Sequence, residues 1–94
     1  MIKGYRDKQT RRFAEGATVK QFASFRHQAE KRLEVLDAAP HLQALRALRS
    51  NRFEALKDDR KGEYSIRINE QWRICFRWPK GEDGPTDVEI TDYH

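Results

Sequence analysis

The sequence contains a single cysteine, Cys75, among 94 residues, so no disulfide can form within the chain. This scarcity favours a reducing compartment, and we expect the protein to work in the cytoplasm. No apolar run approaches the roughly 20 residues needed to cross a bilayer, and the first residues lack the apolar stretch of a signal peptide. We therefore expect no membrane association. The short length predicts a single domain over residues 1–94.

Acidic residues are outnumbered, because 15 Asp and Glu face 19 Lys and Arg and the formal net charge is +4. Nine Lys or Arg and only three acids lie within residues 1–32, whereas residues 82–94 carry five acids and no Lys or Arg. A basic domain favours polyanions as partners, because Lys and Arg replace the counterions that surround phosphate. Many proteins are mildly basic, however, so charge alone does not identify a nucleic-acid partner.

The first half of the chain has a helical period. Asp7 is positioned to cap a first helix that ends at Gly16. Thr18 and Gln21 form a capping-box pattern for a second helix, and Pro40 ends it, because proline disfavours helix in the residue before it. A short further helical turn is expected at 42–48. One apolar stripe follows the second helix at three- and four-residue spacing: Phe22, Phe25, Ala29, Leu33 and Leu36.

The second half changes to a two-residue period. Apolar residues alternate with polar ones at Tyr64, Ile66 and Ile68, and again at Trp72, Ile74, Phe76 and Trp78. Strict alternation predicts two strands, each with one buried face. The Asn69-Glu70 pair between them predicts a tight hairpin turn. Further strands are expected at 2–5, at 52–56 and from Val88 onward.

These elements predict an α+β fold. We expect an antiparallel sheet of about four to five strands with two N-terminal helices packed on one face, in β-α-α-β-β-β order. The opposite face would carry Arg67, Arg73 and Arg77, with Lys57 following the 52–56 strand. A guanidinium grips phosphate oxygens through two parallel hydrogen bonds and stays charged at any working pH. Solvated surface charge is the simpler interpretation of the same pattern.

The end of the chain adds groups that can move protons. Tyr93 and His94 directly follow the last predicted strand, and imidazole titrates near neutrality. A tyrosine can also stack on an unpaired base. Terminal residues are usually mobile, so an ordinary frayed tail is the competing interpretation. Cys75 falls on the same sheet face and is interpreted as a small packing residue.

Two blocks of the sequence resemble the HigB-type toxins of the RelE/ParE superfamily. The first block runs through Leu56-Lys57-Asp58, Gly62-Glu63-Tyr64-Ser65-Ile66-Arg67-Ile68 and Asn69-Glu70-Gln71-Trp72-Arg73-Ile74-Cys75-Phe76. The second block is Asp92-Tyr93-His94. The opening residues 2–7 and the helix that carries Phe13 are also similar, so the resemblance covers nearly the whole chain.

The resemblance implies the toxin of a bacterial type II toxin–antitoxin pair. Such toxins are endoribonucleases that cleave messenger RNA in the ribosomal A site without metal or cofactor. The 2′-hydroxyl of the RNA attacks its own phosphate, displaces the 5′-oxygen and leaves a 2′,3′-cyclic phosphate. The implied partners are the ribosome, messenger RNA and a HigA-like helix-turn-helix antitoxin, with operator DNA contacted only through the antitoxin.

The functional residues of the family fall on this chain one at a time. Its strand arginine falls on Arg73, which implies stabilisation of charge at the scissile phosphate. Its lysine falls on Lys57, which would hold the phosphate or the activated hydroxyl. Its terminal residues fall on Tyr93 and His94. Several relatives have a histidine three residues before that lysine, where this chain has Glu54.

This departure leaves the general base open between Glu54 and His94, because a carboxylate can also accept a proton. The catalytic candidates are therefore Arg73, His94, Tyr93, Lys57 and Glu54, and the expected RNA-binding residues are Arg67, Arg77 and Lys61. No metal ligand is expected, since the adjacent Asp58-Asp59 pair rarely completes a coordination sphere alone.

Two other functions fit parts of the sequence. A ParE-like inhibitor of DNA gyrase would share the fold without cutting RNA. A proton-transfer pair at Tyr93 and His94 favours the nuclease, because a pure inhibitor needs no such groups. A non-catalytic RNA-binding module would use Trp72 and Trp78 as a stacking platform. Their alternation with the core residues indicates instead that both face inward.

Overall fold

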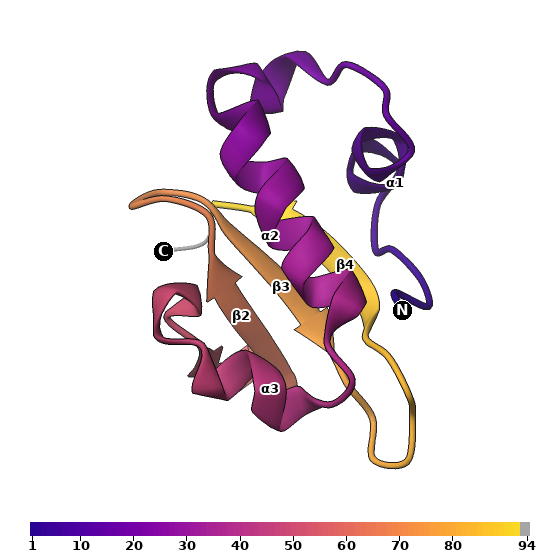
Figure 1. Ribbon diagram of the computed structural model, residues 1–94, viewed down its shortest axis with the longest axis vertical. Helices are drawn as coiled ribbons and strands as arrows, with labels where there is room; N and C mark the ends of the chain where they lie inside the picture. The colour runs from indigo at the N-terminus through magenta and orange to yellow at the C-terminus, as the bar shows by residue number, and fades with distance from the viewer. Residues whose placement is uncertain (93–94) are drawn as a thin grey trace.

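The computed structural model describes residues 1–92 and consists of a four-stranded antiparallel sheet with helices packed against it (Figure 1). The sheet has the order β1-β2-β3-β4, which is also the order along the chain. This architecture confirms the predicted α+β class. The elements are α1 (Lys8–Ala14), α2 (Arg26–Ala38), α3 (Leu42–Ala47), β1 (Glu54–Ala55), β2 (Glu63–Arg67), β3 (Arg73–Arg77) and β4 (Thr86–Thr91), with 3₁₀ helices at Lys20–Phe25, Arg49–Asn51 and Asp58–Arg60.

The predicted alternation sets the register of the sheet. Tyr64 pairs with Phe76 and Ile66 pairs with Ile74, which in turn pairs with Ile90. Because directly paired residues project to the same side, these side chains form one apolar face. The stripe of the second predicted helix lies buried in the same core cluster. The core therefore lies between the helices and one face of the sheet.

The N-terminal segment follows β4 without forming the predicted strand at 2–5. It pairs with β4 only through an isolated parallel bridge between Tyr5 and Val88. Two further backbone hydrogen bonds flank the bridge, from the Lys3 N–H to the Pro85 carbonyl and from the Val88 N–H to the Gly4 carbonyl. Helix α1 continues this cover, because the Ile90 N–H donates to Thr10 Oγ1 at 3.0 Å. The outer edge of β4 is thus protected from pairing with other chains.

The second predicted helix is interrupted. Phe25 leaves the helical region with φ −127° and ψ 28°, so the 3₁₀ helix Lys20–Phe25 ends at this residue and α2 begins at Arg26. The predicted capping box at Thr18 is wrong: Val19 occupies the N-cap position, and it makes no side-chain capping bond. The break has a packing reason, because the Phe25 ring stacks on Trp72 with centroids 5.0 Å apart.

The other helix ends largely follow the sequence. Asp7 is the N-cap residue of α1, but its side chain makes no capping hydrogen bond. Gly16 follows α1 with φ +100°, a conformation that glycine adopts without strain. Ala39 is extended before Pro40, and α2 ends as predicted. The further turn predicted at 42–48 is α3.

The hairpin between β2 and β3 is longer than the predicted two-residue turn, since residues 68–72 separate the strands. Asn69 stabilises this loop through its side chain, whose Oδ1 accepts hydrogen bonds from the N–H groups of Gln71 and Trp72 at 2.8 and 2.7 Å. An asparagine that bonds the backbone ahead of it replaces the hydrogen bonds of a tight turn. The predicted strand at 52–56 is reduced to β1.

Candidate active site on the open sheet face

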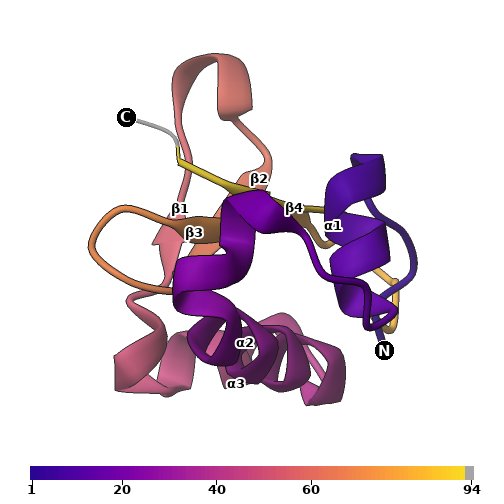
Figure 2. The same ribbon diagram turned by 90° about the horizontal axis from the view of Figure 1, so that it is seen from above.

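The two faces of the sheet differ in what covers them. Helices α2 and α3 lie against one face, and the loop between β1 and β2 rises from the other, which we call the open face (Figure 2). The strand pairings place three cross-strand pairs there: Arg67 with Arg73, Ser65 with Cys75, and Glu63 with Arg77. Glu54 of β1 and Thr91 of β4 extend this face, because they pair with Ser65 and Arg73.

Arg73 is held in place by two hydrogen bonds. Its side chain is 13% exposed at the start of β3. Its Nε donates to Ser65 Oγ at 2.8 Å, and its Nη2 donates to the carbonyl oxygen of Arg52. A guanidinium held on two sides has a fixed direction, unlike the solvated surface charge that was the simpler interpretation of the sequence. A fixed cation is what stabilisation of developing negative charge requires.

Arg52 holds Arg73 from an unusual backbone conformation. Its φ of 47° and ψ of 49° lie in the left-handed region, which is uncommon for a residue other than glycine. Strained residues of this kind cluster at functional sites. Sequence analysis missed Arg52, because nothing in the spacing of the chain marks a left-handed arginine.

Glu54 brings a carboxylate to the arginine. Its Oε1 lies 3.8 Å from Arg73 Nη1, and its side chain is 57% exposed. Lys57 follows β1 and is exposed. Both residues line one pocket formed by residues 54–60. The structure therefore brings a fixed cation next to a solvent-accessible carboxylate, and the residue that carries this carboxylate shares a pocket with Lys57.

Arg67 is the cross-strand neighbour of Arg73 at the same end of the sheet. Directly paired residues have Cβ atoms roughly 5 Å apart, so two cations in these positions repel each other. The only ion pair of Arg67 within residues 1–92 is with Glu70 at 3.9 Å, and Glu70 is 95% exposed. An anion bound between the two arginines would relieve this repulsion.

The other predicted RNA-binding residues lie elsewhere. Arg77 is at the far end of β3, about 13 Å from Arg73 at the usual rise of a strand. Its guanidinium is engaged by Glu63 at 3.7 Å and Asp87 at 3.6 Å. Lys61 is exposed on the loop that follows Asp58–Arg60. The structure thus groups Arg67 with Arg73 and separates Arg77 from them.

Sequence analysis also missed an ion-pair network on the open face. Glu63 is almost fully buried, yet its carboxylate lies 3.2 Å from Arg6 and 3.0 Å from Arg60. The same two arginines approach Glu89 at 3.3 and 3.5 Å. Arg60 thereby ties the β1–β2 loop to the sheet beneath it. The two-residue period places Glu63 and Glu89 on the open face. Their partners Arg6 and Arg60 lie outside the strands, so the period does not predict these ion pairs.

Cys75 lies in the middle of this face and is fully buried. Burial raises the pKa of its thiol to about 11. Since the thiolate is the nucleophilic form, we expect this buried cysteine to react slowly near neutral pH. The environment agrees with the packing role expected from the sequence.

Tyr93 and His94, both predicted to be catalytic, lie outside the described residues. The preceding residues reach the end of the sheet that holds Arg73, because Thr91 pairs with Arg73. Asp92 accepts a hydrogen bond from Gln71 Nε2 at 2.9 Å, which connects β4 to the β2–β3 hairpin.

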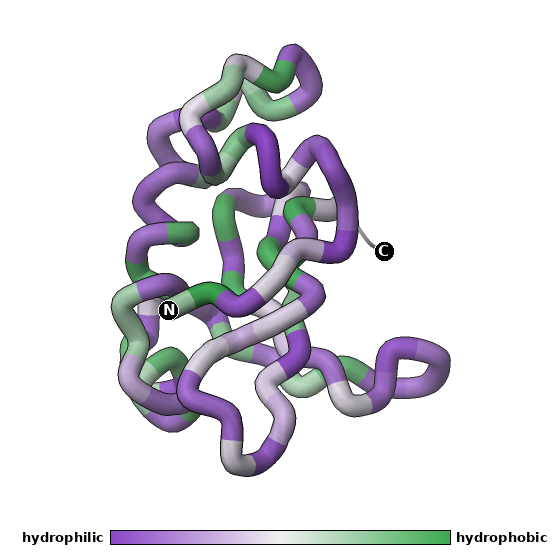
Figure 3. Tube along the Cα trace, turned by 90° about the vertical axis from the view of Figure 1, so that its right-hand side faces the viewer, coloured by the Kyte–Doolittle hydropathy of each residue, from purple (hydrophilic) through white to green (hydrophobic). Residues whose placement is uncertain are grey.

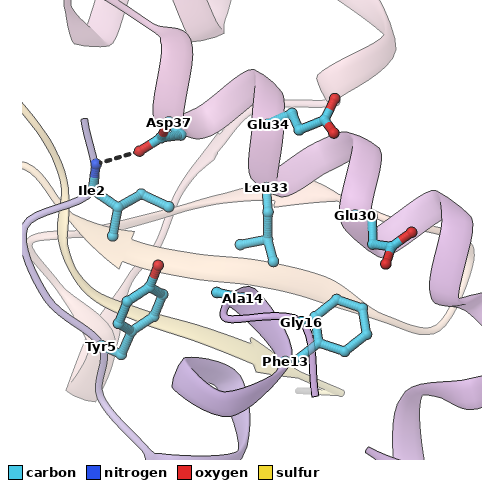
Figure 4. A pocket seen from close by; sticks show the side chains of 9 residues that line it. All are labelled: Ile2, Tyr5, Phe13, Ala14, Gly16, Glu30, Leu33, Glu34 and Asp37. Atoms are coloured by element: carbon cyan, nitrogen blue, oxygen red, sulfur yellow. Dashed lines mark hydrogen bonds between the residues drawn. The ribbon is translucent and has the colours of Figure 1, made fainter. Parts of the chain in front are cut away.

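A separate pocket of about 440 Å³ lies between the N-terminal segment, α1 and α2 (Figure 4). Its walls include Tyr5, Phe13 and Leu33, and its rim carries Glu34 and Asp37. Asp37 is engaged there, since its Oδ1 accepts a hydrogen bond from the Ile2 N–H at 2.8 Å. None of the site residues predicted from the sequence lines this pocket.

Within residues 1–92, no group of three or more His, Cys, Asp and Glu side chains is arranged to hold a metal ion. No helix in the same range is long and apolar enough to cross a membrane. Figure 3 agrees, because apolar and hydrophilic stretches alternate at short intervals along the described trace.

Comparison with known proteins shows similarity to one toxin family. The family model described as "RelE-like toxin of type II toxin-antitoxin system HigB" matches residues 3–94. A stretch of 51 residues is 47% identical to Toxin HigB-1 of Vibrio cholerae serotype O1 (strain ATCC 39315 / El Tor Inaba N16961). That alignment covers 54% of this chain and 54% of the relative, so the chain spans about half the length of the protein it matches.

Proposed function

Because this chain belongs to the RelE-like HigB toxins of type II toxin–antitoxin systems, we propose that it is an endoribonuclease that cleaves messenger RNA in the ribosomal A site. The observation that carries the proposal is the fixed guanidinium of Arg73 beside the carboxylate of Glu54, 3.8 Å away on the open face. A cation that cannot rotate away and a group that can accept a proton are two requirements of RNA cleavage. Both groups lie on the open face of the sheet, which helices α2 and α3 do not cover (Figure 2).

The proposed reaction is an internal transfer within the RNA. The 2′-oxygen loses its proton to a base and attacks the adjacent phosphorus, while the bond from phosphorus to the 5′-oxygen breaks. The 5′-oxygen takes a proton from an acid and leaves as a hydroxyl, and a 2′,3′-cyclic phosphate remains. No water is consumed in this step.

Each residue of the site has a proposed role in that reaction. Arg73 stabilises the negative charge on the phosphorane-like transition state, and Lys57 holds the phosphate or the activated hydroxyl. Glu54 and His94 are the two candidates for the base, and whichever is not the base can protonate the leaving oxygen. Tyr93 either assists this proton transfer or stacks on a base of the RNA.

The magnitudes are those of a modest active site. A proton-transfer group typically supplies about 10²–10⁴-fold in rate. A preorganised donor at developing charge contributes about 3–4 kcal/mol. Orientation of the substrate by the ribosome would add a further entropic gain, since intramolecular alignment removes translational and rotational freedom before reaction. This gain would account for dependence on the ribosome.

The proposal includes partners and organisation. Residues 1–94 would form one toxin domain that is neutralised by a HigA-like helix-turn-helix antitoxin. The toxin would contact operator DNA only through that antitoxin, and it would act in the cytoplasm, where translating ribosomes are found. The proposed function also includes RNA-binding roles for Arg67, Arg77 and Lys61.

A stacking platform formed by both tryptophans has less support. Trp72 packs against Phe25 and Phe22, with ring centroids 5.0 and 5.8 Å apart. Trp78 donates its indole N–H to the Glu82 carbonyl at 2.9 Å. The face of Trp72 is therefore engaged within the protein rather than presented to a base.

The test expresses the wild type, Arg73→Ala and a deletion of His94 in a bacterial host and maps the 5′ ends of messenger RNA. With the wild type, we expect new 5′ ends of messenger RNA within codons. With Arg73→Ala, we expect at least about a hundredfold fewer such ends, because the variant lacks the fixed cation. Arg12→Ala is the matched control, since Arg12 is an exposed arginine on α1.

Two results would contradict the proposal. Growth arrest without new RNA ends, accompanied by broken DNA, would favour the gyrase inhibitor. Equal cleavage by folded Arg73→Ala would remove Arg73 from the active site. Circular dichroism of each purified variant distinguishes loss of activity from loss of folding.

A further inference from the structure

A second cationic site adjoins Arg73 on the side of the β2–β3 hairpin. A groove of about 410 Å³ lies between α2, the segment that precedes β1, and this hairpin. This volume is within the range of about 300–1,000 Å³ that is typical of ligand pockets. We call it the arginine groove, and its lining residues are Gln28, Arg32, Ser50, Arg52, Arg67, Ile68, Asn69 and Glu70.

The charge of the arginine groove is strongly biased. Three of its lining residues are arginines from three separate segments, and the acid among them, Glu70, is 95% exposed. Gln28, Ser50 and Asn69 add amide and hydroxyl groups that can contact sugar, phosphate or base edges. This composition fits an anion that also carries hydrogen-bonding groups.

One arginine is built into the fold. Arg32 Nη1 donates to Asn51 Oδ1 at 2.8 Å. Asn51 is fully buried, and its Nδ2 donates to the Leu45 carbonyl at 3.0 Å. The wall formed by α2 is therefore rigid, and a site with a rigid wall loses little entropy when a ligand binds.

The other two arginines connect the groove to the proposed active site. Arg52 lines the groove, and its carbonyl oxygen accepts a hydrogen bond from Arg73. Arg67 lines the groove and pairs directly with Arg73 across the strands. A chain of phosphates that touches Arg73 therefore passes next to both.

We propose that the arginine groove binds the nucleotide next to the scissile phosphodiester, with Arg52 and Arg67 contacting its phosphate. The ligand class is single-stranded RNA, and the inference rests on the proposed ribonuclease function. Guanidinium groups suit this ligand, because they bind phosphate through two parallel hydrogen bonds. The groove would set which nucleotides flank the cut, while Arg73 and Glu54 act at the cut itself.

The test measures binding without cleavage. A fluorescent single-stranded RNA that is 2′-O-methylated throughout has no 2′-hydroxyl to attack, so it reports affinity alone by anisotropy. The proteins are the wild type, Arg52→Gln and Arg67→Gln. Glutamine keeps a similar stem, and at position 52 it leaves the carbonyl that holds Arg73. Arg12→Gln, on the exposed surface of α1, is the matched control.

We expect each groove variant to bind about five- to tenfold more weakly at roughly 0.1 M salt. The slope of log affinity against log salt should fall by about 0.7 for each phosphate of the single strand that the variant no longer neutralises. Arg12→Gln should change neither quantity. Three results would overturn the inference: no binding by the wild type, unchanged binding by both groove variants, or an equal reduction of affinity in Arg12→Gln. Displacement by a polyglutamate peptide as effective as that by RNA would also overturn it, because the groove would then recognise charge alone.

Failure of this inference is distinguishable from failure of the proposed function. If the wild type cleaves messenger RNA on ribosomes while the groove variants bind and cleave like it, the groove proposal alone is wrong. If methylated RNA binds through Arg52 and Arg67 but the wild type produces no RNA ends, the groove remains and the catalytic proposal is wrong.

Discussion

Ser65 holds the guanidinium of Arg73 in place across the central strand pair. The Ser65 hydroxyl oxygen accepts a hydrogen bond from Arg73 Nε at 2.8 Å, and Ser65 is fully buried. The two residues are diagonal neighbours, because Ser65 pairs with Cys75 while Arg73 pairs with Arg67. A small hydroxyl at this position of β2 therefore determines where the charge of β3 points.

Replacement of this hydroxyl should reduce catalysis more than folding. We expect Ser65→Ala to lower kcat for ribosomal messenger RNA cleavage by about tenfold with KM little changed, because removal of a positioning hydrogen bond affects the transition state most. Urea unfolding should show a decrease of about 1 kcal/mol, typical of one hydrogen bond. Ser24→Ala, at an exposed position in the 3₁₀ helix Lys20–Phe25, is the control. Equal kcat in Ser65→Ala and the wild type would show that Arg73 needs no such support.

The buried carboxylate of Glu63 should contribute to stability. Glu63→Gln removes the negative charge that Arg6 and Arg60 approach at 3.2 and 3.0 Å. We expect a decrease of about 1–3 kcal/mol in the free energy of unfolding, less than for a fully buried pair, because both arginines are partly exposed and can be rehydrated. Urea denaturation measures this.

The matched control is Glu70→Gln, a substitution of the same chemistry at a side chain that is 95% exposed. Its free energy of unfolding should stay within about 0.5 kcal/mol of the wild type. If the two variants are equally stable, the network under the β1–β2 loop contributes nothing to stability.

The sequence predicted the elements that depend on periodicity. Ile66, Ile74 and Ile90 lie on one buried face because alternation alone decides which side of a strand enters the core. Leu33 and Leu36 are buried for the corresponding helical reason. The open face followed directly, since Arg67 and Arg73 occupy the alternate positions.

What the sequence did not predict depends on contacts between distant segments. The break at Phe25 follows from stacking on Trp72, which lies 47 positions later in the chain. The support of Arg73 by the carbonyl of Arg52 requires a left-handed residue at position 52. The short hydrogen bonds of Asn69 replaced the expected tight turn because its side chain competes with the backbone.

Trp72 should behave as a core residue and not as an RNA-binding platform. We expect Trp72→Ala to lower the free energy of unfolding by about 2–4 kcal/mol, because it leaves a cavity against Phe22 and Phe25. Trp72→Phe keeps an aromatic ring in the same place and should cost about 1 kcal/mol. It should also cleave RNA at the wild-type rate. A fall in RNA affinity in a stable Trp72→Phe protein would instead support the stacking platform.

Cys75 should resist alkylation until the protein unfolds. Burial raises the pKa of its thiol to about 11. At pH 8 the folded protein therefore carries about a hundredfold less thiolate than an exposed cysteine would. We expect iodoacetamide to label the protein quickly in urea and at least about a hundredfold more slowly in native buffer, as measured by mass spectrometry. Cys75→Ala should take up no label in either condition.

The same shift gives a pH dependence of stability. The folded state keeps its proton up to about pH 11, whereas the unfolded thiol ionises near its ordinary pKa, so the unfolded state binds fewer protons between these values. The free energy of unfolding should consequently decline as pH rises from about 9 to 11. That decline should be smaller in Cys75→Ala, which has no thiol to ionise. Rapid native labelling at pH 8 together with identical pH profiles of the two proteins would show that the thiol reaches solvent, contrary to its burial between β2 and β4.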